Sequence, residues 1–380
     1  MFLSTQCPVA LNHTAAFSRC QGALGLAGHG GPSGCKLLNM EWATKQYAPA
    51  EIDDAGRVLI RRHSLDELDH ALAVINNWRA AHSFPLNTFQ CTLRRKARQA
   101  DSTALVAQRL KRLSSIYDKL KQMKRLTLSE MQDIGGCRAI VGSVSQVRKL
   151  VDLYKKGDIK HKLDDEDDYI QAPKSSGYRS VHLIYRYFSD KKETYNGQKI
   201  EMQLRSRHQH AWATAVETVG SFTRQALKTS RGEQEWLRFF ALMGTDIANR
   251  ERTAPVPNTP TNRRALKKEL RHHVSLLDVE RKLHAFGEAV HATETAPNDA
   301  HYFLVRLDAE TKQVEITGYS FGDRERAASE YLQAERDIRN NSNTDAVLVS
   351  VESLDALRRA YPNYFLDTTL FLQAVREAIA

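Results

Sequence analysis

The sequence lacks the features that mark several protein classes. It has no apolar run near the roughly 20 residues that a membrane-spanning helix needs. Its five cysteines include no C-x-x-C pair and no histidine at a zinc-like spacing. The N-terminus shows no positively charged leader before its short apolar stretch. We therefore expect a cytoplasmic protein without a membrane partner, a disulfide framework or a structural zinc.

The composition is that of a folded protein with more basic than acidic residues. The 380 residues are 42% hydrophobic and 26% charged, and 19 Gly with 10 Pro are ordinary globular usage. Lys and Arg number 55 against 45 Asp and Glu, a net charge of +10. This length predicts two to three domains at roughly 150 residues each.

The charge is unevenly distributed along the chain. Residues 301–380 hold nine Lys and Arg against thirteen Asp and Glu, a net charge of −4, which leaves +14 for residues 1–300. A basic body suits a polyanion such as RNA or a nucleotide, and an acidic C-terminal part can cover that surface from within the chain. Two solvated surfaces with unrelated compositions would give the same net charges. Coverage of the basic surface by the C-terminal part and the absence of any such contact therefore both stay open.

Composition also predicts the domain boundaries. Residues 1–39 hold six Gly and no acidic residue, which predicts a disordered extension. Residues 40–250 form the first domain. Pro255, Pro257 and Pro260 mark a linker, so residues 251–300 are expected to be a linker and a connecting helix. Residues 301–380 form the second domain.

Periodicity predicts an α/β fold. Ser64 and Glu67 stand at capping-box spacing before an amphipathic helix, and a basic helical stretch is expected over residues 109–125. Apolar segments at 138–142, 181–188 and 199–204 predict strands, with a helix near 147–154. We expect a mixed β-sheet flanked by helices, followed by a small α/β C-terminal domain of pattern β-β-α-β-α-α.

The basic stretch that begins at Arg109 can clamp a triphosphate. Polyphosphate oxygens must be neutralised and held in line during transfer, which calls for several cationic donors and a hydroxyl. No Walker-type phosphate loop is present. The candidate residues are Arg109, Lys111, Ser115 and Lys119. A solvated basic helix face is the alternative.

Two carboxylates are candidates for chemistry. Asp133 precedes Gly135-Gly136 and a strand that contains Arg138, while Glu201, Gln203 and Arg205 share one face of a later strand. A converging carboxylate pair can hold Mg²⁺ and accept a proton from an attacking hydroxyl. Either acid taken singly is more often a surface residue or a helix cap.

A turn between residues 173 and 182 supplies an aromatic ring, cations and an imidazole immediately before a strand. Lys174, Tyr178 and His182 are the residues that would contact a nucleotide. The alternative is a surface loop whose tyrosine only packs.

Taken in order, these motifs resemble RelA/SpoT-type pyrophosphokinase domains. The motifs are R109-x-K111-x3-S115-I-Y-x-K119, D133-I-G-G-x-R138, D168-Y-I-x-x-P-K174-x-x-G-Y178-R-S-V-H182 and E201-M-Q203-L-R205. The resemblance covers about residues 60–225. It implies transfer of the β,γ-pyrophosphate of ATP to a ribose hydroxyl, with release of AMP.

The resemblance also implies roles for individual residues. Asp133 would be the Mg²⁺ ligand, Glu201 the second acidic residue and general base, and Tyr178 the platform for the acceptor nucleoside. The ATP-holding positions are Arg109, Lys111, Ser115, Lys119 and Arg138, and the supporting acceptor positions are Lys174, His182, Gln203 and Arg205.

Two positions depart from the guanine-alarmone synthetases. Many of those enzymes have a basic residue before D-Y-I and an Asn before G-Y, whereas this chain has Asp167 and Ser176. A carboxylate at that position would repel a small polyphosphate acceptor. The departures argue against GDP or GTP as the acceptor.

The C-terminal part resembles the antitoxin-like region of CapRel proteins, which are fused toxin–antitoxin members of the toxic small-synthetase group. The resemblance rests on V347-L-V-S350, L354-x-x-L357 and Y361-P-N-Y364-F365. It implies pyrophosphorylation of the tRNA 3′ end, autoinhibition in which Tyr361 and Tyr364 take part, and activation by a phage capsid protein. The alternative for the two tyrosines is a place in a core between helices.

We therefore expect a tRNA-modifying pyrophosphokinase that uses ATP and Mg²⁺, inhibits translation and is restrained by its own C-terminal region. Two alternatives remain. The chain could make (p)ppGpp or (p)ppApp from free nucleotides, or it could be a catalytically inactive module that binds RNA or a partner.

Overall fold

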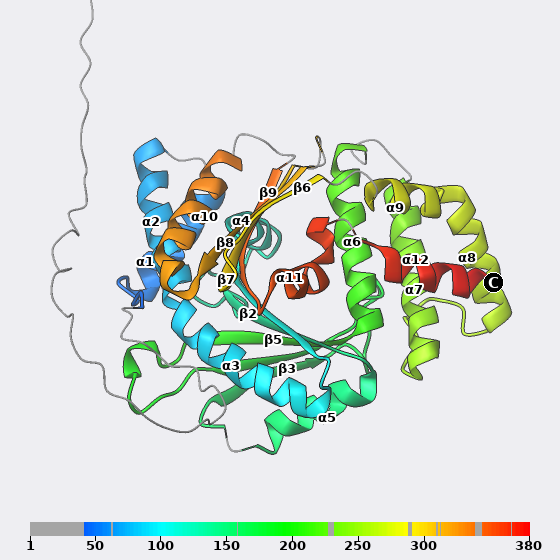
Figure 1. Ribbon diagram of the computed structural model, residues 1–380, viewed down its shortest axis with the longest axis horizontal. Helices are drawn as coiled ribbons and strands as arrows, with labels where there is room; N and C mark the ends of the chain where they lie inside the picture. The colour runs from blue at the N-terminus through cyan, green and yellow to red at the C-terminus, as the bar shows by residue number, and fades with distance from the viewer. Residues whose placement is uncertain are drawn as a thin grey trace, which may run out of the picture. The chain divides into compact units, whose positions relative to one another are not determined.

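The computed structural model describes residues 42–380 apart from 62–63, 158, 227–231, 288–290, 309–310, 312, 339–343 and 366. The extension predicted at 1–39 lies outside the described residues. The described part is an α/β fold in which helices surround one nine-stranded mixed sheet (Figure 1). This confirms the predicted fold class.

The sheet joins the N-terminal and C-terminal halves of the chain. Its strand order is β3-β4-β5-β2-β1-β9-β7-β8-β6, with β2/β5 and β6/β8 parallel and the other neighbours antiparallel. The strands are β1 Leu105–Leu110, β2 Gly135–Val141, β3 Lys162–Asp168, β4 Val181–Arg186, β5 Lys199–Ser206, β6 His291–Thr295, β7 Ala300–Asp308, β8 Gln313–Ser320 and β9 Thr344–Ser350.

The helices form three groups around this sheet. One group packs near the N-terminal half, one packs with the C-terminal strands, and one forms a helical cluster with the last helix of the chain. The helices are α1 Pro49–Ile60, α2 Leu65–Ala81, α3 Ser83–Ala100, α4 Leu113–Gln122, α5 Val144–Lys155, α6 Arg207–Ala226, α7 Gly232–Glu251, α8 Arg263–Leu277, α9 Val279–Gly287, α10 Arg324–Ile338, α11 Leu354–Ala360 and α12 Thr369–Ile379.

Local signals explain where several helices begin. Ser64 accepts from the backbone N–H of Glu67, and the Glu67 carboxylate accepts from the N–H of Ser64, so the predicted capping box is confirmed at α2. Helices α3 and α5 then cover one face of β2, β4 and β5, where Phe89, Leu150 and Met202 are buried. The opposite face of these strands is left for polar residues.

The C-terminal strands extend the sheet at β1. Gln108 and Arg109 on β1 pair with Ser350 and Val349 on β9. Helix α11 packs on one side of the C-terminal strands and α10 on the other, and Figure 1 shows α11 between those strands and α6. The predicted β-β-α-β-α-α pattern matches β7, β8, α10, β9, α11 and α12, and β6 is an additional strand that we did not predict.

One element differs from its prediction. The stretch 109–125 was expected to be helical throughout, but Arg109 and Leu110 end strand β1, and α4 covers only Leu113–Gln122. Antiparallel pairing of Arg109 with Gly136 on one side and Val349 on the other supplies backbone hydrogen bonds that outweigh a local helical preference. Arg109 is therefore presented from a sheet, while Lys119 is presented from a helix.

The Pro-containing segment 253–262 has no helix or strand, yet it is held in place. The buried guanidinium of Arg179 donates to Thr253 Oγ1 and to the carbonyl of Ala254, and Val256 is buried. The described residues pack as one compact unit, and the division into 40–250, 251–300 and 301–380 stays a prediction about the sequence. Within the described ranges, no helix combines the length and the apolar character that a membrane crossing requires.

Candidate active site

The polar face of the sheet gathers side chains from three strands. Arg138 on β2 and His182 on β4 both pair with Gln203 on β5, so the three residues form one row across the sheet. Glu201 and Arg205 flank Gln203 on the same face of β5, because side chains two positions apart point the same way. The residues between them belong to the core under α3 and α5.

Four predicted acceptor-side residues and the predicted general base Glu201 form a closed ring of hydrogen bonds. Nδ1 of His182 lies 2.9 Å from Glu201 Oε1, and its Nε2 lies 2.8 Å from the Tyr178 hydroxyl. Nη2 of Arg205 donates to that hydroxyl at 2.9 Å and to Gln203 Oε1 at 2.7 Å, and Gln203 Nε2 donates to Glu201 Oε2 at 2.8 Å. With its proton on Nδ1, His182 donates to the carboxylate and accepts from the phenol.

The ring of Tyr178 lies among aromatic and cationic neighbours. Tyr169 and Trp212 approach it at centroid distances of 5.8 Å and 6.3 Å, and Lys174 Nζ lies 5.7 Å from its centroid. The turn before it needs a glycine, because Gly177 has φ +98° and a Cβ there would lie 2.8 Å from the Phe240 carbonyl oxygen. The structure therefore brings Lys174 and Tyr178 to the other predicted acceptor residues.

Glu201 is held ionised by its partners. Burial alone would raise the pKa of its carboxyl, but the hydrogen bond and charge of His182, the hydrogen bond from Gln203 and the charge of Lys111 lower that pKa from 4.5 to about 2. The Glu201 side chain keeps 13% of its surface exposed. It is therefore a carboxylate at neutral pH, open on one side to a reactant.

Asp133 is bound by two of the predicted ATP-side cations. Lys111 Nζ lies 2.6 Å from its Oδ2 and Lys119 Nζ lies 2.9 Å from its Oδ1, and its side chain is 17% exposed. The predicted Ser115 lies in the first turn of α4, between these two lysines in sequence. Because Lys111 also lowers the pKa of Glu201, its ammonium electrostatically links the two candidate carboxylates.

The carboxylates of Asp133 and Glu201 are ligands of the kind and number with which proteins usually bind Mg²⁺. Magnesium prefers carboxylate oxygens and is usually bound by one or two of them together with substrate phosphates. Asp133 and Glu201 are two partly exposed carboxylates beside lysines that can receive phosphate. Among the residues that the structure describes, no group of three or more His, Cys, Asp or Glu is placed to hold a metal ion.

Arg109 and Arg138 form a second cationic group, next to the C-terminal region. Burial and the charge of Arg205 lower the pKa of Arg138 to about 10. Burial would also lower the pKa of Arg109, but nearby Tyr364, Tyr361 and Glu217 raise it instead. The Nε groups of Arg138 and Arg205 are buried without a hydrogen-bond partner in the described structure, and phosphate or base acceptors would satisfy such donors.

Tyr361 and Tyr364 lie against this second group. The Arg138 guanidinium lies 5.6 Å from the Tyr361 ring centroid, and Arg112 Nη1 donates to the Tyr364 hydroxyl at 3.2 Å. Both tyrosines are nearly fully buried, at 3% and 1% exposure. The two tyrosines therefore lie beside Arg138 and Arg112, and their predicted regulatory role stays a prediction.

Sequence reasoning missed the carboxylates of the C-terminal region that meet the same cations. Glu335 on α10 accepts from the backbone N–H of Leu113, the first residue of α4, at 2.9 Å, and pairs with Arg79 at 2.7 Å. Asp345 on β9 pairs with Arg112. Arg112 lies inside the basic stretch and could have been included with it, but nothing in the sequence pairs Glu335 with Arg79.

Asp167, the residue that departs from the expected pattern, lies on the same face of the sheet as His182 and the other candidate residues. It pairs with His182 across β3 and β4, so both side chains point to the same side of the sheet. Its neighbour Asp168 is paired with Arg148. Burial and a hydrogen bond to Asp167 raise the pKa of Tyr169 to about 12. The carboxylate of Asp167 therefore meets a phenol rather than a cation.

Comparison with known proteins locates the similarity in the part of the chain that carries this site. Residues 108–221 match the family described as "Region found in RelA / SpoT proteins". GTP pyrophosphokinase YjbM of Bacillus subtilis (strain 168) is 34% identical over 116 residues, which are 29% of this chain and 52% of that protein. GTP pyrophosphokinase YwaC of the same organism is 33% identical over 115 residues, which are 28% of this chain and 52% of that protein. The chain thus spans about half the length of these curated relatives.

Two solved structures are also similar to part of this chain, at lower identity. A GTP pyrophosphokinase family protein from Streptococcus pneumoniae is 23% identical, with 50% of this chain and 92% of that chain covered and a TM-score of 0.39. Small alarmone synthetase 1 from Bacillus subtilis is 20% identical, with 54% and 94% covered and a TM-score of 0.36. The matched residues 108–221 include β2, β4 and β5, the end of β1 and every ATP-side and acceptor-side candidate.

Proposed function

We propose that this protein is an ATP-dependent pyrophosphokinase whose acceptor is the 3′ end of tRNA and whose C-terminal region holds it inactive. The observation that carries the enzymatic part is the position of Lys111, which binds Asp133 and lowers the pKa of Glu201. Lys111 thus connects the two carboxylates, and the aromatic Tyr178 joins Glu201 through His182. A binding module would need the platform and the cations but not both carboxylates.

In the proposed reaction, a ribose hydroxyl oxygen attacks the β-phosphorus of ATP. The bond between that phosphorus and the oxygen bridging to the α-phosphate breaks, AMP leaves, and the hydroxyl proton passes to Glu201. Lys111 and Lys119 would bind the polyphosphate, and Tyr178 would stack on the acceptor base. Asp133 and Glu201 would hold Mg²⁺, which supplies charge neutralisation for the polyphosphate when bound.

We choose tRNA over a free nucleotide as the acceptor because of the charges around the site. The Asp167 carboxylate, on the same face of the sheet as His182, would repel the phosphates of a small nucleotide acceptor, whereas the terminal ribose of an RNA carries free hydroxyls. The +14 of residues 1–300 suits the RNA backbone. Modification of the tRNA 3′ end would block aminoacylation and thereby translation.

The proposed inhibition by the C-terminal region rests on its contacts with the cations near the ATP-side candidates. Tyr361 lies at Arg138, Tyr364 and Asp345 bind Arg112, and Glu335 accepts from the first turn of α4. These contacts occupy the positions where a nucleotide and its phosphates would bind. Activation then requires a partner that binds the released C-terminal region better than the docked one. By the resemblance to CapRel proteins, that partner is a phage capsid protein and the role is anti-phage defence.

A second candidate function is synthesis of (p)ppGpp or (p)ppApp from free nucleotides. It is favoured by the names of the curated relatives, which are GTP pyrophosphokinases. The two functions use the same donor chemistry and differ only in what reaches Tyr178. A catalytically inactive RNA- or partner-binding module is a third candidate, and the retained carboxylates oppose it.

One experiment separates these candidates. The full chain with Tyr361→Ala/Tyr364→Ala is incubated with γ-³²P ATP and Mg²⁺ and with total tRNA, GDP, GTP or ATP as acceptor, beside the same protein carrying Glu201→Gln. Label in RNA supports the proposed function. Label only in small products would establish synthesis from free nucleotides. If the protein is folded and transfers no label to any acceptor, the third candidate, the binding module, is supported.

A further inference from the structure

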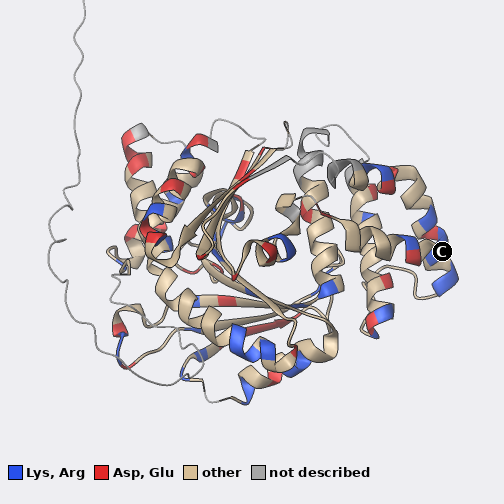
Figure 2. Cartoon of the chain, in the orientation of Figure 1, with Lys and Arg blue, Asp and Glu red and all other residues tan. Residues whose placement is uncertain are grey.

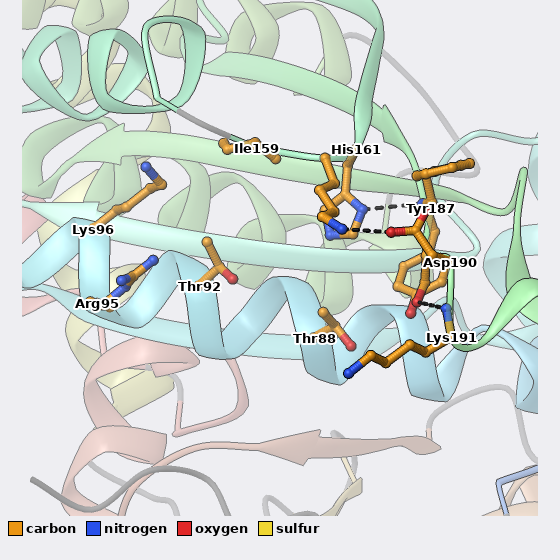
Figure 3. A pocket seen from close by; sticks show the side chains of 12 residues that line it. Thr88, Thr92, Arg95, Lys96, Ile159, His161, Tyr187, Asp190 and Lys191 are labelled. Atoms are coloured by element: carbon orange, nitrogen blue, oxygen red, sulfur yellow. Dashed lines mark hydrogen bonds and ion pairs between the residues drawn. The ribbon is translucent and has the colours of Figure 1, made fainter.

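A cavity lined by several charged side chains shares no residue with the candidate active site. It has a volume of about 330 Å³ and opens between α3, the turn before β3 and the segment after β4, a size within the range of ligand-binding pockets. Figure 3 shows Arg95 and Lys96 at one end, Lys191 at the other, and Thr92 and His161 between them. We call this cavity the α3 groove.

The α3 groove has a surplus of positive charge. Among its described lining residues Asp190 is the one carboxylate, and it is paired with Lys160 at 2.6 Å. The side chains of Arg95 and Lys191 are exposed, and neither has an ion pair or hydrogen bond within the described structure. Figure 2 shows Lys and Arg along the neighbouring helices α3 and α5. Unpaired cations at both ends of a groove suit a ligand with more than one phosphate.

The repulsion between neighbouring cations affects the pKa of Lys96. Burial and the positive charge of Arg95 lower the pKa of Lys96, and no carboxylate opposes that change. Lys96 Nζ donates to the carbonyl of Leu153 at 2.7 Å, so it is fixed beside Arg95. A phosphate bound here would relieve the repulsion between two neighbouring cations.

An aromatic surface lies between the cations. The His161 ring packs against Phe89 and Tyr187 at centroid distances of 4.5 Å and 5.0 Å, and burial lowers its pKa, so the ring is neutral at physiological pH. Phe188 donates its backbone N–H to His161 Nδ1 and leaves 46% of its surface exposed. An exposed aromatic ring in a groove lined by cations is the arrangement by which proteins bind unpaired nucleotides.

We propose that the α3 groove binds a short stretch of single-stranded RNA, with phosphates at Arg95 and Lys191 and an unpaired base against Phe188. The groove follows the end of β4, whereas His182 lies near its beginning, six residues from Phe188 or roughly 20 Å along a strand. It is therefore separate from the active site but close enough to contact the same RNA. The choice of RNA rests on the proposed function, and the experiment below separates the two.

The test measures RNA binding by the full chain. Glu201→Gln serves as the background so that no transfer occurs, and fluorescence anisotropy is recorded with a fluorescein-labelled 12-nucleotide RNA at 50 to 200 mM KCl. The variant Arg95→Glu/Lys191→Glu is compared with Lys45→Glu/Lys282→Glu, which changes the same charge at two exposed lysines outside the groove. Circular dichroism verifies that both fold.

We expect the groove variant to bind at least tenfold more weakly than its control, with a salt slope reduced by about 1.4 for two lost phosphate contacts. Phe188→Ala should weaken binding by roughly fivefold or more. Equal binding by the groove variant and its control would overturn the proposal, as would competition by free ATP or GTP with none by unlabelled RNA. Transfer to tRNA is measured separately, so its failure would count against the acceptor and not against the groove.

Discussion

The two halves of the candidate active site are stabilised in different ways. On the acceptor side, Tyr178, His182, Glu201, Gln203 and Arg205 satisfy one another within 28 residues of sequence. On the ATP side, Lys111 and Lys119 pair with Asp133, whereas Arg138 and the neighbouring Arg112 find partners in the C-terminal region. The acceptor half can therefore persist when the C-terminal region leaves, whereas the ATP half would gain free cations.

This difference indicates where control operates. A regulator that acts on the ATP half changes the binding of the donor that every turnover needs, and it leaves the acceptor platform preorganised. The C-terminal region also shares a sheet with the ATP half through β1 and β9. Displacing it would free the edge of β1, the strand that carries Arg109.

The largest effect is expected from the two carboxylates. In the Tyr361→Ala/Tyr364→Ala background, Glu201→Gln and Asp133→Asn should each lower pyrophosphate transfer by on the order of 10² to 10⁴-fold, because proton acceptance and metal binding are lost. Initial rates with labelled ATP measure this. Glu193→Gln, at an exposed position, is the matched control and should leave the rate unchanged. Transfer retained in either active-site variant would remove that residue from the mechanism.

The second effect tests the ATP half directly. Tyr361→Ala/Tyr364→Ala in the otherwise intact chain should raise transfer by at least tenfold, since the rings at Arg138 and Arg112 are removed. Expression should become toxic, and the same pair with Glu201→Gln should be harmless. Because both tyrosines are buried, unfolding is monitored as well. A folded but silent double variant would show that the tyrosines only pack.

The third prediction concerns the buried ion pair between α2 and α10. Arg79 and Glu335 have side-chain exposures of 3% and 10%, so Glu335→Gln should leave a buried cation unpaired and lower the free energy of unfolding by about 3–5 kcal/mol. Urea titration measures this. Arg79→Leu/Glu335→Leu should recover most of the loss.

The exposed pair Asp54–Arg57 serves as the comparison for that prediction. Its side chains are 58% and 60% exposed, and Asp54→Asn should change the free energy of unfolding by less than about 1 kcal/mol. Similar losses for Glu335→Gln and Asp54→Asn would mean that the α2–α10 pair contributes little to holding the C-terminal region.

The fourth prediction separates the two roles of Tyr178 on the acceptor side. Tyr178→Ala should raise the KM for the acceptor by roughly fivefold or more through loss of the stacking face, with little change in the KM for ATP. Tyr178→Phe keeps that face and removes only the hydroxyl that binds His182 and Arg205. If the two variants behave alike, the hydroxyl and not the ring is what the acceptor side requires.

The smallest effect is a pH dependence from Glu201. Its pKa is lowered from 4.5 to about 2 in the folded state, so the carboxylate contributes stability above pH 4.5 that is lost as the pH falls from 4.5 toward 2. The free energy of unfolding should therefore decline less between pH 6 and pH 3 for Glu201→Gln than for the unmodified protein. Parallel urea titrations at the two pH values compare them, and identical declines would contradict the assignment.

The sequence predicted the acceptor side well because its determinants are local. Alternation along residues 201–205 places Glu201, Gln203 and Arg205 on one face whatever the rest of the fold does. The turn at Gly177 brings Tyr178 beside the start of β4, four residues before His182. The strand at Arg109 was misjudged because β1 is defined by its partners β2 and β9, which lie elsewhere in the chain.

By itself, the sequence determined the α/β class, and it singled out the candidate site residues and the two tyrosines of the C-terminal region, whose roles stay predictions. Only the tertiary structure decided that Glu335, Asp345 and Tyr364 bind Arg79, Arg112 and the first turn of α4. These partners stand 222 to 256 residues apart. An ion pair across such a separation leaves no local pattern, because any carboxylate can neutralise any cation and only the folded backbone brings these ones together.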